Sequence, residues 1–179
     1  MKWYFIDKKY INFLKKIDYK VSNVDYGENK MKGFIGVVLQ KENNTNYFAP
    51  ITSYKKKFEG MPDNIDFIKI FDNNSKILGA LDLNNMIPVP DNLCVEVTFD
   101  NLEEFRTFKN IEEKIKYWNL LKKELKFLNK KKYIINNNAN RLYNIVKNKQ
   151  NHPISKRCCN FKLLEEKCME YENLILETS

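Results

Sequence analysis

The sequence predicts an α+β protein in which a strand-rich part, residues 1–100, precedes a helix-rich part, residues 101–179. Before residue 100, short apolar runs alternate with turn residues such as Asn, Asp and Gly, which is typical of strands. After residue 100, apolar residues recur every three or four positions, which is typical of helices. Strands followed by helices indicate an α+β fold with a strongly bent antiparallel sheet. The length of 179 residues fits one domain over residues 1–179.

The strand-rich part contains several short apolar runs. After the first run, Asp7 provides the N-cap of a helix with an apolar face. The turn residues 42–46 separate two runs and predict a β-hairpin. The stretch M-I-P-V-P (86–90) predicts an extended loop or an edge strand, because proline cannot donate to a strand ladder. The predicted strands lie at residues 2–6, 33–40, 47–51, 67–71, 76–83 and 94–99.

The helix-rich part begins with apolar residues spaced three or four apart over 102–128. They predict one long helix, or two helices broken near residues 109–110. A shorter helix is expected at 140–146, and a last helix follows Asn160, whose side chain can cap its first turn. Asn-rich segments predict loops at 43–46, 72–75 and 136–140.

The net charge of the chain is +8, from 31 Lys and Arg against 23 Asp and Glu. This charge favours a polyanionic partner, either nucleic acid or an anionic membrane surface, although it also serves plain solubility. The apolar runs are far shorter than the roughly 18 residues of a membrane span. The N-terminal segment lacks the apolar core and cleavage site of a secretory signal. We therefore expect a cytoplasmic protein that does not cross a membrane.

The usual metal-ligand sets are missing from the sequence. The chain has one histidine, His152, and four cysteines without a C-x-x-C pair. Its acidic residues are scattered rather than grouped at metal-ligand spacing. We interpret the cysteines as reduced, mostly buried thiols, and we expect no metal ion and no other cofactor.

The stretch Y-F-A-P-I-T-S-Y-K-K-K-F, residues 47–58, has an unusual strand end. Two hydroxyl residues, Thr52 and Ser53, are followed by three lysines, where a plain strand end needs only turn residues. Whether the chain extends or turns here, Ser53 and Lys55 can reach one phosphate and stabilise charge that builds up on it. A motif this short is a weak signal, and by itself it favours a basic hairpin end over an active site.

The rest of the sequence narrows the chemistry that this motif could serve. One histidine excludes a two-imidazole ribonuclease mechanism, and neither a G-x-x-x-x-G-K-[ST] phosphate loop nor a G-x-S-x-G nucleophile elbow is present. Metal-free RNA cleavage remains, in which the RNA's own 2′-hydroxyl is the nucleophile. The protein then supplies positioning, proton transfer and charge stabilisation, which Ser, Thr and Lys provide in part.

A second basic feature is the segment 109–132, which carries nine lysines and three glutamates. It predicts either a solvated helix face or a surface that binds RNA phosphates, since lysines pair with phosphate without reading sequence. The candidate RNA-binding residues in this segment and beside the strand end are Tyr54, Lys56, Lys57, Lys122, Lys123, Lys126 and Lys130.

The chain resembles the endoribonuclease toxins of bacterial type III toxin–antitoxin systems, the ToxN/AbiQ family. The resemblance covers nearly the whole chain, although residues 100–150 match only in helical pattern. The stretches A-P-I-T-S-x-K (49–55) and N-N-M-I-P-V (84–89) are the most specific. They lie within the longer matching stretches 47–57 and 78–89, and the other matching stretches are 4–18, 32–39 and 159–167.

This resemblance implies a fold and an activity. The fold is a compact, highly twisted antiparallel sheet with flanking helices, similar to the MazF/Kid toxins. Family members cut cellular or phage RNA without metal, often at adenine-rich sites, and leave a 2′,3′-cyclic phosphate and a 5′-hydroxyl. A repeat-containing RNA antitoxin, which they process, holds them inactive in a closed toxin–RNA hetero-oligomer. Their roles are phage defence by abortive infection and plasmid maintenance.

The resemblance also implies a set of catalytic residues. Ser53 matches the position most important for activity, and Thr52 and Lys55 match its neighbours in the site. Lys32 matches a lysine of the active site. Tyr26 matches a family tyrosine shortly before that lysine, at a different spacing.

Three other functions fit the same sequence. A non-catalytic RNA-binding protein would bind RNA in a salt-sensitive manner without cutting it. A MazF-like homodimeric ribonuclease would have a small acidic protein as its antitoxin. A membrane-surface protein would place the lysine-rich helix on anionic lipid, although the apolar face of that helix is long enough to belong to the core.

Overall fold

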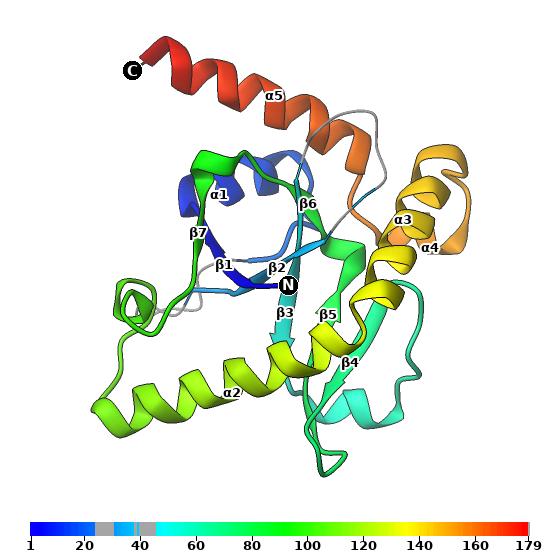
Figure 1. Cartoon of the computed structure of the whole chain (residues 1–179). Coiled ribbons are helices and arrows are strands. Elements are labelled where there is room, and N and C mark those ends of the chain that lie inside the picture. The colour runs from blue at the N-terminus through cyan, green and yellow to red at the C-terminus, as the bar shows by residue number, and fades with distance from the viewer. Residues whose placement is uncertain (24–30, 38, 40–45, 179) are drawn as a thin grey trace.

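Seven short strands form one antiparallel sheet in the computed structural model, which describes residues 1–23, 31–37, 39 and 46–178 (Figure 1). The strands are β1 Trp3–Ile6, β2 Phe34–Val37, β3 Tyr47–Ser53, β4 Phe67–Phe71, β5 Ile77–Asp82, β6 Ile87–Pro88 and β7 Cys94–Glu96. They lie in the order β4-β5-β3-β2-β1-β7, and β6 pairs with β3 outside this path. In Figure 1, β2 crosses the view while β3 and β5 run down it, so the sheet is strongly bent, as predicted.

Strand β3 connects the two ends of this bent sheet. Residues 47–50 pair with β2, which confirms the predicted hairpin, while its connecting turn at 42–46 lies outside the described residues. The start of β3 also pairs with β6, so the M-I-P-V-P stretch includes a two-residue strand. At the other end of β3, Ser53 faces Gly79 of β5. The hydroxyl pair therefore lies where the sheet passes from β2 to β5.

Five α-helices flank the sheet in the described part of the chain. They are α1 Lys8–Ile17, α2 Ile111–Lys130, α3 Lys132–Asn148, α4 Pro153–Arg157 and α5 Phe161–Thr178. The predicted caps are present: Asp7 accepts a hydrogen bond from the Tyr10 N–H at 2.8 Å, and Asn160 accepts one from the Leu163 N–H at 3.2 Å. Helix α2 packs on β4 and β5, whereas α5 packs on α1 and β6.

Two arrangements were predicted for residues 102–128, and the single long helix is wrong, because the helix begins only after residue 110. Asn110 caps α2, because its side chain accepts a hydrogen bond from the Glu113 N–H at 2.9 Å. The residues before it form only a 3₁₀ turn, Leu102–Glu104, rather than a first α-helix. They are nevertheless part of the core, since Phe105 stacks on Phe5 with ring centroids 4.1 Å apart. The spacing of the apolar residues before Asn110 therefore reflects their burial in the core and not a long helix.

The helix predicted at 140–146 is wrong in its extent. Helix α3 runs through 136–140, which was predicted to be a loop because it is rich in asparagine. Each asparagine lowers helix propensity by less than about 0.7 kcal/mol, a small cost beside the burial of a whole apolar face. The buried residues of that face are Ile135, Ala139, Leu142 and Tyr143.

Contacts between residues far apart in sequence join the strand-rich and helix-rich parts. The Met1 amine donates to Asn129 Oδ1 at 2.6 Å, and the Cys159 N–H donates to the Asn84 carbonyl at 2.9 Å. As expected from the sequence, three of the four cysteines are buried. No described helix combines the length and the apolar character needed to cross a membrane.

Candidate active site

The hydroxyl pair lies at an exposed end of β3. The strand ends at Ser53, whose side chain is exposed, and a 3₁₀ turn, Lys56–Gly60, follows. The side chain of Phe58 anchors this turn, because it is 3% exposed and its ring packs on Phe67 with centroids 5.2 Å apart. The chain therefore turns inward at Phe58 and leaves the three lysines before it in solvent.

A chain of hydrogen bonds connects three strands at this point. Lys32 Nζ, just before β2, donates to Thr52 Oγ1 of β3 at 3.1 Å. The Thr52 hydroxyl in turn donates to Oδ2 of Asp82, the last residue of β5, at 2.5 Å. Lys32 is only 7% exposed, so its ammonium group is held inside the protein rather than free in solvent.

The carboxyl of Asp82 is surrounded by positive charge. Burial raises the pKa of Asp82 above its ordinary value, while the hydrogen bond from Thr52 and the charges of Lys32, Lys55 and Lys57 oppose this rise. The positive charges of these three lysines therefore all act on one carboxyl group. Sequence reasoning missed Asp82, although an acidic residue that ends an apolar strand inside one of the matching stretches was a usable signal.

A cavity of about 320 Å³ opens between β3 and α2 on the Ser53 side. Lys32, Ser53 and Lys55 are among its lining residues, so the predicted catalytic residues face it. Two polar residues that sequence reasoning missed, Arg106 and Glu124, also line it. Its apolar lining includes Trp3, Met31, Ile51, Tyr117, Leu120 and Leu121.

A second hollow, of about 430 Å³, opens on the Thr52 side of the same strand end. Several of the polar groups that line it already have partners. Arg157 Nε and Nη2 donate to the two carboxylate oxygens of Asp66 at 2.5 and 2.9 Å. Thr52 and Lys55 line both hollows, so the end of β3 separates them.

The structure brings together four of the five predicted catalytic residues, while Tyr26 lies outside the described residues. The predicted RNA-binding residues are all exposed, and the Tyr54 hydroxyl donates to Glu59. Among them, Lys57 lines the Thr52-side hollow and Tyr54 lines the Ser53-side cavity. Four lysines of α2 line neither hollow: Lys122, Lys123, Lys126 and Lys130.

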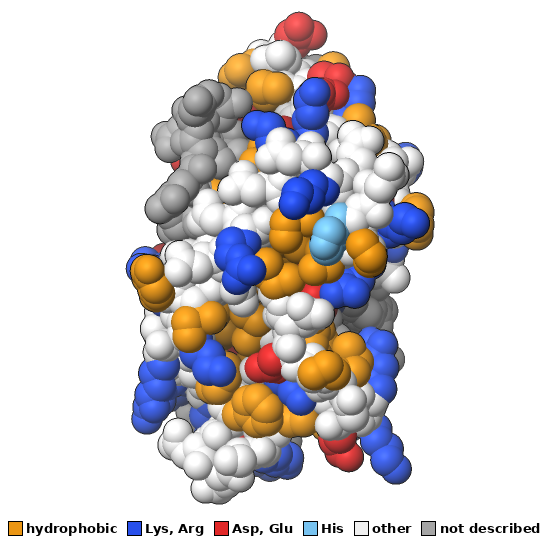
Figure 2. Space-filling view, turned by 90° about the vertical axis from the view of Figure 1, so that its right-hand side faces the viewer, with side chains coloured by type: hydrophobic (Ala, Val, Ile, Leu, Met, Phe, Trp, Pro, Cys, Tyr) orange, Lys and Arg blue, Asp and Glu red, His pale blue; other side chains and the backbone are white. Residues whose placement is uncertain are grey.

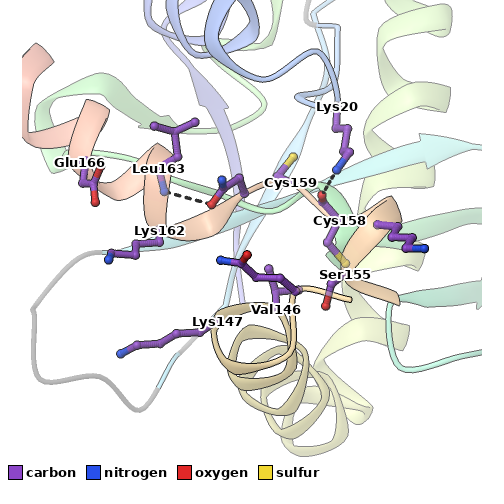
Figure 3. Close-up of a pocket in the computed structure, with 12 residues that line it drawn as sticks. Lys20, Val146, Lys147, Ser155, Cys158, Cys159, Lys162, Leu163 and Glu166 are labelled. Atoms are coloured by element: carbon purple, nitrogen blue, oxygen red, sulfur yellow. Dashed lines mark hydrogen bonds between the residues drawn. The ribbon is translucent and has the colours of Figure 1, made fainter. Parts of the chain in front are cut away.

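A third hollow, of about 470 Å³, lies among α3, α4 and α5 (Figure 3). Four lysines line it: Lys20, Lys147, Lys156 and Lys162. It shares no lining residue with the two hollows at the β3 end. Figure 2 shows that Lys and Arg side chains are also spread over one broad face of the molecule, with few acidic side chains among them. Positive charge is therefore distributed widely rather than confined to the β3 end.

Comparison with known proteins identifies the family. The sequence model described as "Toxin ToxN, type III toxin-antitoxin system" matches residues 2–169. The chain belongs to this family. It is 35% identical over 182 residues to the endoribonuclease ToxN of Bacillus thuringiensis subsp. kurstaki, covering 96% of this chain and 84% of that protein. It is 30% identical to the endoribonuclease AbiQ of Lactococcus lactis subsp. lactis, covering 96% and 89%.

Solved structures of ToxN/AbiQ proteins share the fold. One, from work on selective toxin inhibition by a non-coding RNA pseudoknot, has a TM-score of 0.78 at 31% identity and covers 96% of this chain and 97% of its own. A second, AbiQ, a lactococcal anti-phage endoribonuclease of a type III system, has a TM-score of 0.78 at 28% identity and covers 96% and 98%. The predicted α+β class, antiparallel sheet and family are therefore confirmed.

Proposed function

We propose that this protein is an endoribonuclease toxin that cuts RNA without a metal ion, through attack of an RNA 2′-hydroxyl on the adjacent phosphate. The observation that carries the proposal is the convergence of Lys32, Thr52 and Lys55 beside the exposed hydroxyl of Ser53. Named endoribonucleases among the relatives support it. The positive charge of lysines and the hydrogen bonds from hydroxyls can stabilise the developing negative charge, which a metal ion stabilises in other enzymes.

The chemistry assigns a task to each group in the site. The 2′-oxygen forms a bond to phosphorus while the bond from phosphorus to the 5′-oxygen breaks, so the products carry a 2′,3′-cyclic phosphate and a 5′-hydroxyl. The 2′-hydroxyl loses a proton and the 5′-oxygen gains one. We assign stabilisation of the phosphate oxygens to Ser53 and Lys55, and the proton transfers to Lys55 or Lys32.

Thr52 has a different task from Ser53 in this proposal. A hydroxyl has one proton to donate, and that of Thr52 goes to Asp82, while its oxygen accepts from Lys32. Thr52 is therefore a positioning residue that holds the Lys32 ammonium in the site, with Asp82 behind it.

We further propose that a repeat-containing RNA is the antitoxin and closes with the toxin into a hetero-oligomer in the cytoplasm. The net charge of +8 and the solved relative inhibited by an RNA pseudoknot support an RNA partner. One domain over residues 1–179 and a core similar to MazF/Kid toxins remain predictions. Co-expression with a tandem-repeat RNA, followed by light scattering, should give a complex heavier than one protein chain plus one RNA repeat.

The proposed activity is tested by incubating the purified protein with a mixed-sequence RNA in excess EDTA and mapping the product ends. We expect cyclic-phosphate and 5′-hydroxyl ends, and we expect Ser53→Ala to lower the cleavage rate by about 10²-fold or more, because one donor to the developing charge is lost. Since Ser53 is exposed, its replacement should leave the melting temperature unchanged. RNA that stays intact with protein free of bound RNA, or full activity of Ser53→Ala, would contradict the proposal.

A further inference from the structure

The cavity between β3 and α2 has an exposed mouth and a buried floor. Ser53 and Lys55 are exposed at its mouth, whereas Glu124 is 3% exposed and Trp3 is 4% exposed. The Trp3 ring is fixed, since its Nε1–H donates to the Leu121 carbonyl at 3.0 Å. A phosphate that binds at the mouth therefore leaves the deeper space to another part of the same nucleotide.

The backbone of β5 makes room for the Glu124 carboxyl on the Ser53 side. Ser53 faces Gly79, and the next residue along, Tyr54, donates its N–H to the Leu78 carbonyl at 3.0 Å. Ser53 and Gly79 thus form a non-hydrogen-bonded pair, in which Cα atoms lie about 4.5 Å apart and side chains share one face. A Cβ on Gly79 would lie 3.4 Å from Glu124 Oε1. The carboxyl therefore occupies the space beside Ser53 that a side chain at position 79 would take.

Two polar groups of this cavity lack hydrogen-bond partners among the described residues. The Glu124 carboxyl has no hydrogen bond and no ion pair there. Arg106 Nε–H is buried and has no acceptor, and its guanidinium lies 4.3 Å from the centre of the Tyr117 ring. Buried polar groups are nearly always paired, because an unpaired one loses its hydrogen bonds to water without gaining any from the protein. The unpaired Glu124 carboxyl is therefore open to a ligand that enters the cavity, and the Arg106 side chain lines the same space.

The protonation state of Glu124 indicates which kind of ligand fits. Burial raises the pKa of this carboxyl to about 8, so it is mostly a neutral acid at pH 7. A neutral carboxyl has one donor and one acceptor side by side. The edge of a nucleobase offers the same adjacent pair, whereas a phosphate offers acceptors only.

We propose that this cavity is a nucleobase pocket, in which Glu124 and Arg106 hydrogen-bond the edge of a base that flanks the cleaved phosphate. The proposal rests on the proposed function, because it takes RNA as the substrate. The apolar and aromatic walls suit the faces of a flat ring, and single-stranded RNA is commonly read by turning bases out into such pockets. Glu124 is thus a specificity-determining residue for the cleavage reaction.

The test uses two series of short RNAs that differ only in the base on the 5′ or the 3′ side of one cleavage site. Binding is measured with Ser53→Ala protein, so that cleavage does not interfere. We expect one base at one position to bind about 10-fold more tightly than the weakest, as one bidentate contact allows. Adding Glu124→Ala should reduce this ratio to within about 2-fold, whereas Glu124→Gln, which keeps a donor and an acceptor, should retain most of it.

The matched control is Glu112→Ala in the same background, because Glu112 is an exposed glutamate in the first turn of the same helix. It should leave the ratio unchanged. A ratio that survives Glu124→Ala, or no base preference in the first place, would overturn the pocket. If wild-type protein fails to cut any RNA while the binding preference still depends on Glu124, the pocket stands and the proposed activity fails. If RNA is cut and the ratio of affinities does not depend on Glu124, the proposed activity stands and the pocket fails.

Discussion

The two sides of the β3 end differ in how their polar groups are satisfied. On the Thr52 side, the Thr52 hydroxyl donates to Asp82 and accepts from Lys32, which itself lines the Ser53-side cavity. On the Ser53 side, the Glu124 carboxyl lines a cavity without a hydrogen-bond partner among the described residues, and the Arg106 Nε–H is buried there without an acceptor. A satisfied network holds one geometry, whereas unsatisfied groups keep their capacity for a ligand. We infer that the Thr52 side sets the shape of the site and the Ser53 side receives the RNA.

The buried Glu124 carboxyl on the Ser53 side should make the stability of the protein depend on pH. Glu124→Gln should remove this contribution. The pKa of Glu124 is raised to about 8 in the folded protein, while an unfolded glutamate ionises near 4.3. Between these values the folded state keeps a proton that the unfolded state has lost, so the free energy of unfolding falls as pH rises. The upper limit of this fall is about 5 kcal/mol, because each pKa unit corresponds to about 1.4 kcal/mol.

Urea denaturation of wild type and Glu124→Gln at pH 5, 7 and 9 measures this difference. The variant should gain on the wild type as pH rises, and the gain should level off above pH 8. The other ionisable groups around the cavity are common to both proteins and cancel in the comparison: Lys32, Tyr54, Lys55, Arg106 and Tyr117. A constant difference between the two proteins over this pH range would show that the carboxyl is not held neutral.

The hydrogen-bonded chain through Thr52 predicts a large loss of activity in Lys32→Met. Methionine keeps much of the buried volume of Lys32 but removes the charge that Thr52 positions. We expect the single-turnover cleavage rate to fall about 10²-fold, because Lys32 is one of the two groups to which the proton transfers are assigned. The control is Lys56→Met, since Lys56 is exposed and has no place in the hydrogen-bonded chain. Equal rates for the two variants would mean that the chain of hydrogen bonds does not serve catalysis.

The close approach of Gly79 in β5 to the backbone of Thr52 in β3 predicts that Gly79→Ala destabilises the protein. A Cβ at this position would lie 2.6 Å from the Thr52 carbonyl oxygen, which forces the backbones of β3 and β5 apart. We expect the free energy of unfolding to fall by about 1–3 kcal/mol, as for other overpacked sites. Gly60→Ala is the matched control, because its Cβ would meet no atom within 4 Å. Similar urea midpoints for both variants would contradict the close approach at Gly79.

The smallest effect is expected from lysines that line neither hollow at the β3 end. Replacing Lys122 and Lys126 with Gln removes two exposed charges from one face of α2. If both contact RNA, affinity should fall several-fold, and the slope of log affinity against log salt should become shallower by about 1.4, or about 0.7 per contact. Fluorescence anisotropy with Ser53→Ala protein at several salt concentrations measures both quantities. An unchanged slope would show that these lysines do not contact RNA and belong to a solvated helix face.

Local signals in the sequence predicted much of the fold. The period of apolar residues, the caps Asp7 and Asn160, and the turn residues each act within a few positions, so they can be read along the chain. The same reasoning failed at 136–140, because asparagine propensity is weak and burial against the rest of the core outweighed it. It also took the apolar residues around Leu102 for helix, although they pack without one.

Some features of the site were likewise predicted from the sequence, whereas others were decided only by the tertiary structure. The run from Thr52 to Lys55, with Lys32 before the paired strand, was found from the motif and the family resemblance. By itself the sequence determined the strand end, its hydroxyls and its positive charge. Glu112 and Glu124 read alike along the lysine-rich helix, yet one is exposed and the other is buried beside Gly79. Only the packing of α2 on β5 decided this difference, because desolvation depends on residues that lie close in space and far apart in sequence.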